Sequence, residues 1–531
     1  MQHDEDPIRY PYRRVADQDA SHPVRHPVVV AGAGLVGLVT ALDLAGRGVP
    51  VVVLDAGEGV SAGSRAMCFA RRSLEILGRL GCAEAAVAAG IPWHAGRVHH
   101  GPDVICGVEH GPEAGQRRPA FLNLPQAQLE AILVARLRAL ADAGAPVSLR
   151  GANRIIAVGT HPDHVRLEVE TPEGPYSLHA DWLVACDGAN SSVRRMMALG
   201  FPGRGYEDAF LIADVAMDSD APAERMFWFD PPFNPGRSAL LHRQPGNLWR
   251  IDLQIGADAD AAAELAPDRV LPRLRAMLGG QARFTVESLA IYRFHCRRME
   301  RFVHGRVLFA GDAAHQVSPF GARGANSGIQ DADNLGWKLA AVIAGAAPEL
   351  LESYNWERGL AAEENIQAAA RASDFITPRS DASRAFRDAV LTLAGRHPFA
   401  REMVNTGRMA EPCTYDDGPL NGPDAAGLPG RTRPGAAAVD VPCAGGWLLD
   451  RLPQGFALLA IDADAPEAGL PVLRLGSAGH GALAAAWTGA GGGVVALLRP
   501  DGHVAARWHT AAGTPTPGDI AAALATAGGT S

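Results

Sequence analysis

After a polar, charged start, the chain alternates between short apolar runs and longer stretches with helical spacing. Residues 28–31 (VVVA) form a short β-branched run between His-Pro and Gly, which predicts a buried strand. Residues 35–47 carry apolar residues at helical spacing, and residues 50–55 (PVVVLD) repeat the buried-strand pattern. Strand, helix and strand in this order predict a parallel βαβ unit.

Further elements follow in the next part of the chain. Apolar residues at helical spacing recur around residues 74–80 and 129–140, which predicts two more helices. Between about residues 150 and 180 the pattern shortens and alternates, as in an antiparallel meander. The run WLVAC at 182–186 predicts another buried strand, and it leads directly into Asp187-Gly188.

Residues 200–300 are strand-like, aromatic and rich in turns. In LLHRQPGNLWRIDLQI (240–255) two runs flank a Pro-Gly-Asn turn, which predicts a hairpin. The second run alternates apolar and polar residues, which predicts a sheet with one dry and one polar face. The polar face, which includes Arg250, Asp252 and Gln254, either meets solvent or lines a pocket.

The last part of the chain changes character twice. Residues 325–400 have a largely helical pattern, and residues 414–435 form a linker rich in Gly and Pro. About 95 residues remain, with apolar runs such as FALLAI and VVALLRP. These runs predict a small α/β domain over residues 436–531.

Length, charge and cysteine content narrow the class of protein. The 531 residues suffice for about three domains of roughly 150 residues, and a net charge of −9 disfavours nucleic acid as a partner. Seven cysteines without a CxxC pair disfavour a disulfide framework and a dithiol redox centre. The longest uncharged apolar run has about 15 residues, fewer than the ~20 of a membrane helix, and the start is unlike a signal peptide. We therefore expect a soluble cytoplasmic protein that does not contact a membrane.

The chain lacks the sequence motifs of several other classes of enzyme. There is no P-loop and no GxSxG elbow, which disfavours a kinase or a serine hydrolase. The histidines at 99, 100, 161 and 164 lie in loop-like stretches without the spacing of a ligand set, so no metal is expected.

A glycine motif stands between the first predicted strand and the first predicted helix. GAGLVG supplies Gly32, Gly34 and Gly37, and Asp55 follows at the end of the next strand. The first glycine permits a tight turn, the second lets backbone approach a pyrophosphate, and the third lets the helix pack on the strand. Asp55 is placed to accept hydrogen bonds from ribose hydroxyls. A purely structural turn is the alternative, but this strand–turn–helix context favours a dinucleotide site.

Two further motifs follow predicted strands in the same way. These motifs are Asp187-Gly188 and Gly311-Asp312. Because ligands bind at the carboxyl ends of the strands in a doubly wound sheet, we expect all three motifs to meet along one elongated ligand. The helix that begins near Asn326 would then direct its N-terminus at a region that becomes negative, as a reduced flavin does.

These motifs carry a resemblance to a known family. GAGLVG, DGANSSVR (187–194) and GDAAHQVSPFGARGAN (311–326) resemble the three fingerprints of the single-component FAD-dependent aromatic hydroxylases, the p-hydroxybenzoate hydroxylase superfamily. The resemblance is greatest for the branch similar to 3-(3-hydroxyphenyl)propionate hydroxylase. It covers about residues 27–395, and residues 497–508 are similar to the thioredoxin-like C-terminal domain of that branch.

The resemblance implies the fold and the domain boundaries. The implied fold is α/β: a Rossmann-like FAD-binding domain of the glutathione-reductase type, an inserted antiparallel-sheet substrate domain and a small thioredoxin-like C-terminal domain. A homodimer is a further expectation. The implied segments are an N-terminal arm (1–26), the FAD-binding domain (27–195 and 300–400), the substrate domain (196–299), the linker (414–435) and the C-terminal domain (436–531).

The resemblance also assigns cofactor contacts to matching positions. Arg65 would lie over the cofactor, Asp312 would bind the ribityl chain, and Asn326 would meet the flavin pyrimidine. Gln126 would touch FAD, although the spacing from Asn123 to Gln126 also fits a capping box. The implied FAD-binding residues are Gly32, Gly34, Gly37, Asp55, Arg65, Gln126, Asp187, Gly311, Asp312, Gly324, Ala325 and Asn326.

The reaction is implied in the same way. NADH or NADPH reduces FAD, O₂ adds at flavin C4a, and the hydroperoxide transfers its distal oxygen to a phenol or another electron-rich aromatic ring. No second GxGxxG follows a strand, as in hydroxylases whose nicotinamide cofactor docks transiently. Met67 stands where the family has a second arginine, so the sequence does not choose between NADH and NADPH.

The substrate pocket is expected between the 200–300 sheet and the loop at Pro319, which would lie by the reacting ring. Aligned on the hairpin, His242 falls where the p-hydroxybenzoate enzyme has a substrate-binding serine, and Gln244 where it has a carboxylate-binding arginine. A neutral or differently anchored phenol is therefore expected. His242 could accept a phenolic proton, and His295 could line the pocket or the nicotinamide groove. Both histidines could equally be structural.

Two other functions stay open from the sequence. A flavin halogenase shares the implied fold, but it needs a WxWxIP-like stretch and a lysine between flavin and substrate. The single lysine, Lys338, lies in the helix after the Gly-Asp motif. A non-catalytic flavin-binding sensor or assembly subunit is the second alternative, and substrate-stimulated NAD(P)H oxidation would distinguish the hydroxylase from it.

Overall fold

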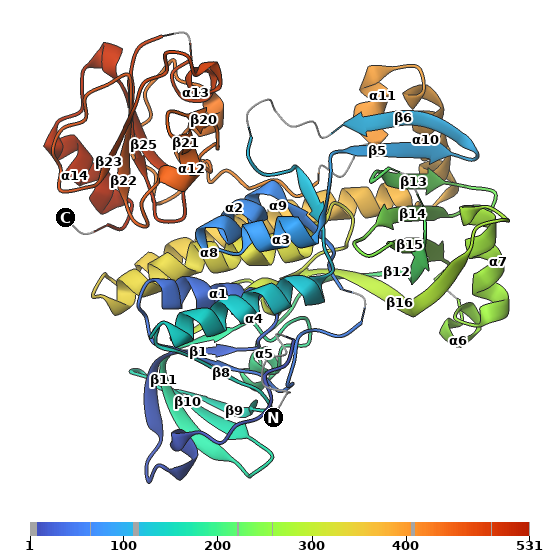
Figure 1. Cartoon of the computed structure of the whole chain (residues 1–531), viewed down its shortest axis with the longest axis horizontal. Helices are drawn as coiled ribbons and strands as arrows, with labels where there is room; N and C mark the ends of the chain where they lie inside the picture. The colour runs from blue at the N-terminus through green and yellow to red at the C-terminus, as the bar shows by residue number, and fades with distance from the viewer. Residues whose placement is uncertain are drawn as a thin grey trace.

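The computed structural model describes residues 8–63, 65–109, 116–219, 222–257, 259–404, 409–489 and 491–529. They form three lobes around a layer of long helices at the centre of the molecule (Figure 1). Two lobes are built on eight-stranded sheets, and the C-terminal lobe is built on a four-stranded sheet.

The first sheet has the strand order β17-β18-β11-β1-β2-β8, and β10 and β9 extend it from β11. The pairs from β18 through β11, β1 and β2 to β8 are parallel. The predicted βαβ unit is present, because α1 (Leu35–Gly46) connects β1 to β2. The strands are β1 (Val24–Ala31), β2 (Val51–Leu54), β8 (Val147–Arg150), β9 (Arg154–Thr160), β10 (Val165–Glu170), β11 (Tyr176–Ala185), β17 (Val303–His304) and β18 (Val307–Phe309).

Helices α1, α4 (Gln126–Asp142) and α8 (Arg323–Ile343) run side by side over this sheet (Figure 1). The β-branched residues 28–30 are fully buried beneath them, as their apolar run predicts. Shorter elements complete this lobe: η1 (Ala16–Asp19), β3 (Cys68–Ala70), α2 (Arg71–Arg79), α3 (Ala83–Ala89), β4 (Ile91–Trp93), β7 (Phe121–Asn123), α5 (Ser192–Met196) and η2 (Gly311–Ala313).

The described part of the N-terminal segment packs against this lobe. Tyr10 is buried in the core of the first sheet, and its hydroxyl donates a hydrogen bond to Gly59 O at 2.6 Å. Strand β1 begins at Val24, earlier than the apolar run at 28–31 predicts, because residues 24–26 already pair with β11. Pairing with a neighbour extends the strand beyond its apolar segment.

The second sheet has the order β19-β16-β12-β15-β14-β13-β5-β6. The predicted hairpin at 240–255 is formed by β14 and β15. The sheet reaches beyond residues 196–299, because β5 pairs in parallel with β13. The strands are β5 (Ala95–His100), β6 (Asp103–Glu109), β12 (Gly203–Met217), β13 (Arg225–Phe229), β14 (Ser238–Arg243), β15 (Leu248–Ile255), β16 (Phe284–Arg298) and β19 (His315–Gln316).

The two faces of the second sheet differ as predicted. Trp249, Ile251 and Leu253 are buried with α7 (Pro267–Leu278) in an apolar core. The alternate residues Arg250 and Asp252 line a cleft on the opposite face. The polar face therefore lines a pocket. From the sequence alone, it could also have faced solvent. The short helix α6 (Ala261–Glu264) precedes α7.

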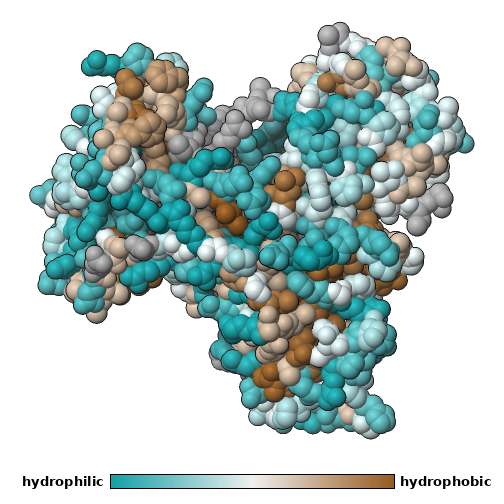
Figure 2. Space-filling model, turned by 180° about the vertical axis from the view of Figure 1, so that it is seen from behind, coloured by the Kyte–Doolittle hydropathy of each residue, from teal (hydrophilic) through white to brown (hydrophobic). Residues whose placement is uncertain are grey.

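The predicted helical region contains α8, α9 (Leu350–Ile376), α10 (Asp381–Ala394) and α11 (Pro398–Val404). Helices α10 and α11 cover the far end of the second lobe (Figure 1). Figure 2 shows an apolar patch at the upper left of the rear view, over these two helices. The exposed apolar side chains there are Phe386, Leu393, Phe399 and Met403.

The C-terminal lobe has the strand order β23-β22-β24-β25, with β22 and β23 parallel and the other pairs antiparallel. The segment expected to be a linker is ordered here, because Tyr415 is buried and its hydroxyl accepts a hydrogen bond from Arg358 at 2.9 Å. The elements are η3 (Gly430–Thr432), β20 (Pro442–Cys443), β21 (Gly446–Trp447), α12 (Leu448–Arg451), β22 (Ala457–Ile461), β23 (Val472–Leu475), α13 (Gly481–Trp487), β24 (Val494–Leu498), β25 (Val504–His509), η4 (Thr510–Ala512) and α14 (Pro517–Thr526).

No helix within the described ranges has the length and apolar character that a membrane crossing requires.

Candidate active site

One long cleft of about 1070 Å³ joins the carboxyl ends of the first sheet to the polar face of the second. It is lined by the turn after β1, the end of β2, the start of α4 and the loops after β11 and β18. All the predicted site residues line it except Gly37, Gly311 and Asn326. The three motifs that follow strands therefore meet along one elongated cavity, as expected.

The glycine turn after β1 brings backbone to the wall of the cleft. Gly32 has φ +99°, a left-handed conformation that suits glycine. A Cβ on Gly37 would lie 1.9 Å from Gly32 O, so only glycine lets α1 start this close to the turn. A Cβ on Gly34 would meet only a Glu130 oxygen, at 3.9 Å, so this position is open to the cleft. Gly32 thus forms the turn, Gly37 lets α1 pack against it, and Gly34 leaves backbone open to the cleft.

Asp55 follows β2 and supports the same turn. Its Oδ2 accepts a hydrogen bond from Ala33 N at 2.6 Å, and its Oδ1 accepts one from Gly57 N at 2.7 Å. Burial raises the pKa of this carboxyl above its usual value, and the two backbone donors oppose that rise. Asp55 thus fixes the turn as well as lining the cleft.

Helix α4 begins at Gln126, and its N-cap residue, Pro125, makes no side-chain hydrogen bond. The capping box suggested by the spacing from Asn123 to Gln126 therefore does not form. The Gln126 side chain instead lines the cleft and donates to Glu130 Oε1 at 2.7 Å. Glu130 is fully buried and also accepts from Leu35 N at 2.9 Å and from Ser61 N at 2.7 Å. This carboxylate connects the start of α1 to the loop before Arg65. It has no motif around it, so the sequence did not single it out.

Two acids face the middle of the cleft. Asp187 binds the first turn of α5, because its Oδ2 accepts from Ser192 Oγ and Val193 N, each at 3.0 Å. Its Oδ1 is buried without a hydrogen-bond partner in the described part of the chain. Asp312 is exposed to the cleft. Desolvation raises the pKa of its carboxyl above the usual value, and the electrostatic effects of His315 and Arg65 partly oppose that rise.

The loop before α8 is fixed by a buried ion pair. Asp331 Oδ2 accepts from Gly311 N at 2.9 Å and lies 2.6 Å from His315 Nε2, and its Oδ1 accepts from Arg358 Nε at 2.6 Å. Burial acts to raise the pKa of Asp331, but the electrostatic and hydrogen-bond contributions of His315 and Arg358 outweigh it and hold that pKa below its usual range. His315 is therefore a structural residue of this loop.

Helix α8 starts at the cleft, but the side chain of Asn326 is bound within the protein. Arg323, Gly324 and Ala325 line the cleft at the first turn, where backbone N–H groups lack intrahelical partners. The Asn326 side chain is fully buried and bonds to Ala70 N at 2.8 Å and to Cys68 O at 2.9 Å. It holds β3 against the helix, so its side chain is already used within the protein.

The second sheet supplies the other wall. Leu240, Phe294 and Phe320 give this end of the cleft an apolar lining, next to His242, Asp252 and Arg225. His242 is 7 % exposed, and burial lowers its pKa well below the usual value, with Arg225 and Arg250 adding to the effect. Pro319 and His295 line the same cleft. Gln244 does not, because it is buried against Met67, whose Sδ lies 3.3 Å from its amide nitrogen.

Arg225 and Asp252 are site residues that the sequence analysis missed. Asp252 belongs to the alternating polar face, so its position on a pocket wall was one of two open alternatives. Arg225 is the first residue of the aromatic strand β13 and carried no signal of its own in the sequence. No group of three or more metal-binding side chains is found among the described residues.

A model of the protein family described as FAD binding domain matches residues 25–369. The chain belongs to the FAD-dependent aromatic hydroxylases. It is 30% identical over 392 residues to a 3-(3-hydroxy-phenyl)propionate/3-hydroxycinnamic acid hydroxylase of Mycolicibacterium smegmatis, over 74% of this chain and 68% of that relative. It is also 30% identical to a para-nitrophenol 4-monooxygenase of a Pseudomonas species, over 68% of this chain and 89% of that relative.

Solved structures agree with this membership. The p-nitrophenol 4-monooxygenase PnpA of Pseudomonas putida superposes with a TM-score of 0.64 at 28% identity, covering 73% of this chain and 100% of that one. The flavin-dependent monooxygenase PieE, in complex with FAD and substrate, shares the fold with a TM-score of 0.78 at 21% identity, over 95% of this chain and 100% of that one. The predicted family is confirmed: this hydroxylase is an FAD-dependent monooxygenase, and NAD(P)H is the co-substrate typical of its family.

The cleft of this hydroxylase fits FAD. It is long enough to reach from the glycine turn to the second sheet, and backbone is open to it at Gly34. Asp187 has a buried oxygen that no described residue hydrogen-bonds, and Asp312 is exposed to the cleft. Glycine backbone for a pyrophosphate and carboxylates for hydroxyl groups are the donors and acceptors that a dinucleotide requires.

Proposed function

We propose that this enzyme hydroxylates a phenol held between the polar face of the second sheet and the loop before α8. The observation that carries the proposal is the continuity of the cleft from Gly34 to His242 and Phe294. FAD, when bound along the cleft, supplies the oxygen-transfer chemistry, with O₂ and either NADH or NADPH as co-substrates. The names of the similar proteins, which include hydroxylases of hydroxylated aromatic compounds, support this substrate class.

The residues around the substrate end have separate tasks in this proposal. Leu240, Phe294 and Phe320 exclude water from the reacting groups, which limits unproductive loss of the oxidant. His242 is neutral near pH 7 because burial disfavours its charged form, so it can accept a hydrogen bond from a substrate hydroxyl. Pro319 and His295 are the further candidates for contact with the reacting ring or the nicotinamide.

The domain roles are also proposals. We assign the substrate to the second sheet, as an inserted domain, because its polar face lines the cleft. The parallel β22–β23 pair beside the antiparallel β24 and β25 supports a thioredoxin-like C-terminal domain, although its sequence has no CxxC. The homodimer and the cytoplasmic location stay predictions.

The function is tested by the coupling of oxidation to product. We expect a phenol that fits the cleft to stimulate NADH or NADPH oxidation by the purified enzyme at least about tenfold, with hydroxylated product formed in step with the oxidation. Oxidation is followed by absorbance and product by chromatography, over a panel of phenols with and without a carboxylate. Oxidation that no phenol accelerates, with hydrogen peroxide as the sole product, would contradict the proposal.

Replacement of Asp312 by asparagine is expected to weaken FAD binding by about 10- to 100-fold. The carboxylate faces the cleft, and a hydrogen bond to a charged group contributes about 1.5–3 kcal/mol. The dissociation constant of FAD is measured by fluorescence on apoprotein, with Asp268→Asn, an exposed residue of α7, as the matched control. Equal FAD affinity in both variants would exclude Asp312 as a cofactor ligand.

A further inference from the structure

Sulfur-containing side chains line the cleft at five positions: Met67, Cys68, Cys186, Met196 and Met409. Cysteine reacts with oxidants as the thiolate. Burial raises the pKa of the Cys68 thiol to about 12 and also raises the pKa of the Cys186 thiol, so both stay protonated near pH 7. A methionine thioether needs no ionisation to be oxidised to the sulfoxide. The three methionines are therefore the sulfur groups of the cleft that an oxidant can modify.

Met409 differs from the other two methionines in where its sulfur lies. Arg225 Nη1 donates to Met409 Sδ at 3.6 Å, and Arg225 itself lines the substrate end of the cleft. The Sδ of Met67 instead accepts from the buried amide of Gln244, which does not line the cleft. Met196 ends α5 in the first lobe and is exposed to solvent. Met409 is thus the methionine whose sulfur lies at the wall of the substrate end.

The surroundings of Met409 hold it beside the loop that precedes α8. Ala410 N donates to Gly321 O at 2.8 Å, and the Met409 side chain packs in an apolar cluster with Ala322 of the same loop. Met409 is 4% exposed, so the protein shields it from the outer surface although it lines the cleft. An oxidant that arises inside the cleft therefore reaches this sulfur more readily than the same oxidant in bulk solution.

Arg225 favours the oxidised form of this methionine. A thioether sulfur is a weak hydrogen-bond acceptor, whereas the oxygen of a sulfoxide is a strong one. The Nη1 of Arg225 already points at the sulfur, and its Nε is buried without a hydrogen-bond partner among the described residues. An oxygen added to the Met409 sulfur would accept a charge-assisted hydrogen bond from this guanidinium.

We propose that Met409 is a modification site, at which hydrogen peroxide released in the cleft converts the thioether to a sulfoxide. The sulfur lone pair attacks one peroxide oxygen, the O–O bond breaks, and the other oxygen leaves with both hydrogens as water. The sulfur loses two electrons and the peroxide gains them, so the reaction needs no further reactant. The polar sulfoxide beside Arg225 should weaken the binding of an aromatic ring. The inference rests on the proposed function, because turnover without hydroxylation supplies the peroxide.

The test follows methionine oxidation during turnover in the presence of catalase, which removes peroxide that reaches the solution. The FAD-loaded enzyme oxidises NADH or NADPH with a phenol from the panel. Trypsin cleaves after Arg401 and Arg408, so Met403 and Met409 fall into separate peptides, which are quantified by mass spectrometry. Met403 is 36% exposed on α11 and reports peroxide in solution. We expect at least about fivefold more oxidation of the Met409 peptide than of the Met403 peptide.

Added peroxide gives the reverse order and serves as the control. When the resting, FAD-loaded enzyme is treated with hydrogen peroxide without catalase or NAD(P)H, the exposed Met403 should be oxidised before the shielded Met409. The peroxide released during turnover is obtained as the difference between NAD(P)H oxidised and product formed. If this amount exceeds the amount of enzyme and Met409 is oxidised no faster than Met403, the inference is wrong.

Three variants test what the modification does. Met409→Leu has about the same volume but cannot be oxidised, so it should keep its own initial rate of hydroxylation over the turnovers in which the wild type loses about half. Met409→Gln places a polar group at the wall and should bind the phenol about tenfold more weakly from the start. Met403→Leu is the matched control and should lose activity as the wild type does. A flavin absorption spectrum equal to that of the wild type shows that each variant is folded around its cofactor.

The outcomes separate this inference from the proposed function. Repeated reduction of the FAD-loaded enzyme with dithionite and reoxidation by O₂, with catalase present, generates peroxide in the cleft without nicotinamide or phenol. If these cycles oxidise Met409 but no phenol gives a product, the modification site stands and the proposed function is wrong. If product forms and Met409 stays reduced in both experiments, the proposed function stands without the modification site. A Met409→Leu variant that loses activity as fast as the wild type overturns the effect assigned to the sulfoxide.

Discussion

Replacement of Gly37 by alanine is expected to give a colourless protein that no longer retains FAD. The added Cβ would lie 1.9 Å from Gly32 O, a backbone atom that no side-chain rotation can move aside, so α1 must move away from the turn. Overpacking of this kind costs about 1–3 kcal/mol or more, and here it displaces the helix N-terminus from the cleft. The measurement is the ratio of flavin to protein absorbance after purification, followed by titration with added FAD.

A matched control lies on the same helix. Gly46 ends α1, and a Cβ there would have nothing within 4 Å, so Gly46→Ala should retain FAD. Its free energy of unfolding should stay the same or rise by about 0.5–1 kcal/mol, because alanine restricts the unfolded chain and favours the helix. A Gly37→Ala protein that purifies as yellow as Gly46→Ala would show that the close approach of α1 to the turn is not needed for cofactor binding.

The dinucleotide end of the site was predictable because its signals are local. The spacing of Gly32, Gly34 and Gly37 and the acid at Asp55 follow from the geometry of one strand–turn–helix–strand unit. The carboxyl ends of parallel strands meet at one edge of a sheet. Asp187 and Asp312 each follow a buried apolar run, so the sequence is enough to place both acids at the same edge, where both line the cleft.

The substrate end could not be predicted to the same depth, since it depends on pairing between distant segments. Arg225 reaches the cleft only because β13 pairs with β14 on one side and with β5, far earlier in the chain, on the other. Asp252 could be assigned to a polar face, but only the position of α8 decides whether that face meets solvent or a cavity. Asn326 belongs to a recognisable motif, but the motif does not show that its side chain is hydrogen-bonded to the backbone of Cys68 and Ala70.

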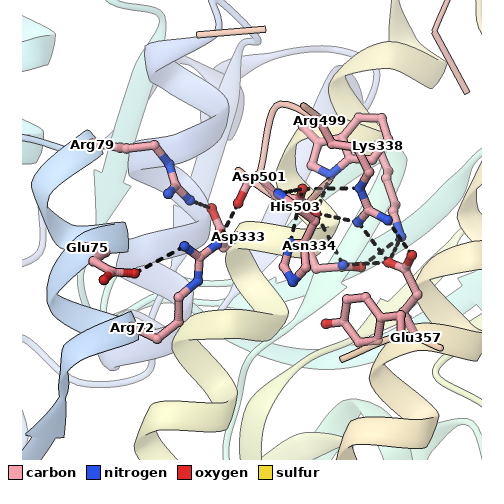
Figure 3. A network of polar contacts seen from close by, with 12 residues as sticks. Arg72, Glu75, Arg79, Asp333, Asn334, Lys338, Glu357, Arg499, Asp501 and His503 are labelled. Atoms are coloured by element: carbon pink, nitrogen blue, oxygen red, sulfur yellow. Dashed lines mark hydrogen bonds and ion pairs between the residues drawn. The ribbon is translucent and has the colours of Figure 1, made fainter. Parts of the chain in front are cut away.

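The junction with the C-terminal lobe was also invisible in the sequence. Figure 3 shows side chains of α2, α8, α9 and the 499–503 turn meeting in one polar network. At its centre Glu357 is fully buried and accepts from Lys338 at 2.7 Å, from Asn334 at 2.7 Å and from both terminal nitrogens of Arg499. The network joins two helices to a turn about 140 residues further along the chain, and none of these residues belongs to a motif. The C-terminal lobe is thereby joined through buried charges to the helix that starts at the cleft.

Replacement of Glu357 by glutamine is expected to destabilise the protein by about 3–5 kcal/mol. The substitution keeps the shape of the side chain but removes the negative charge that pairs with Lys338 and Arg499. Both cations then stay buried, and Arg499 keeps its ion pair with Asp501. Burial already lowers the pKa of Lys338 to about 8, although Glu357 opposes this shift. We expect the midpoint of thermal unfolding to fall by roughly 5 °C or more, measured by circular dichroism and by flavin fluorescence.

The same substitution at Glu352 is the control, because this residue also lies on α9 and pairs with an arginine. The Glu352 and Arg301 side chains are each 52% exposed, and a surface pair of this kind contributes about 0–1 kcal/mol, so Glu352→Gln should unfold close to the wild-type temperature. In Glu357→Gln, limited proteolysis should cut first between the lobes, around residues 414–435, because the contact that holds the C-terminal lobe is weakened. If both variants unfold alike and resist the protease alike, the buried network does not join the C-terminal lobe to the flavin-binding lobe.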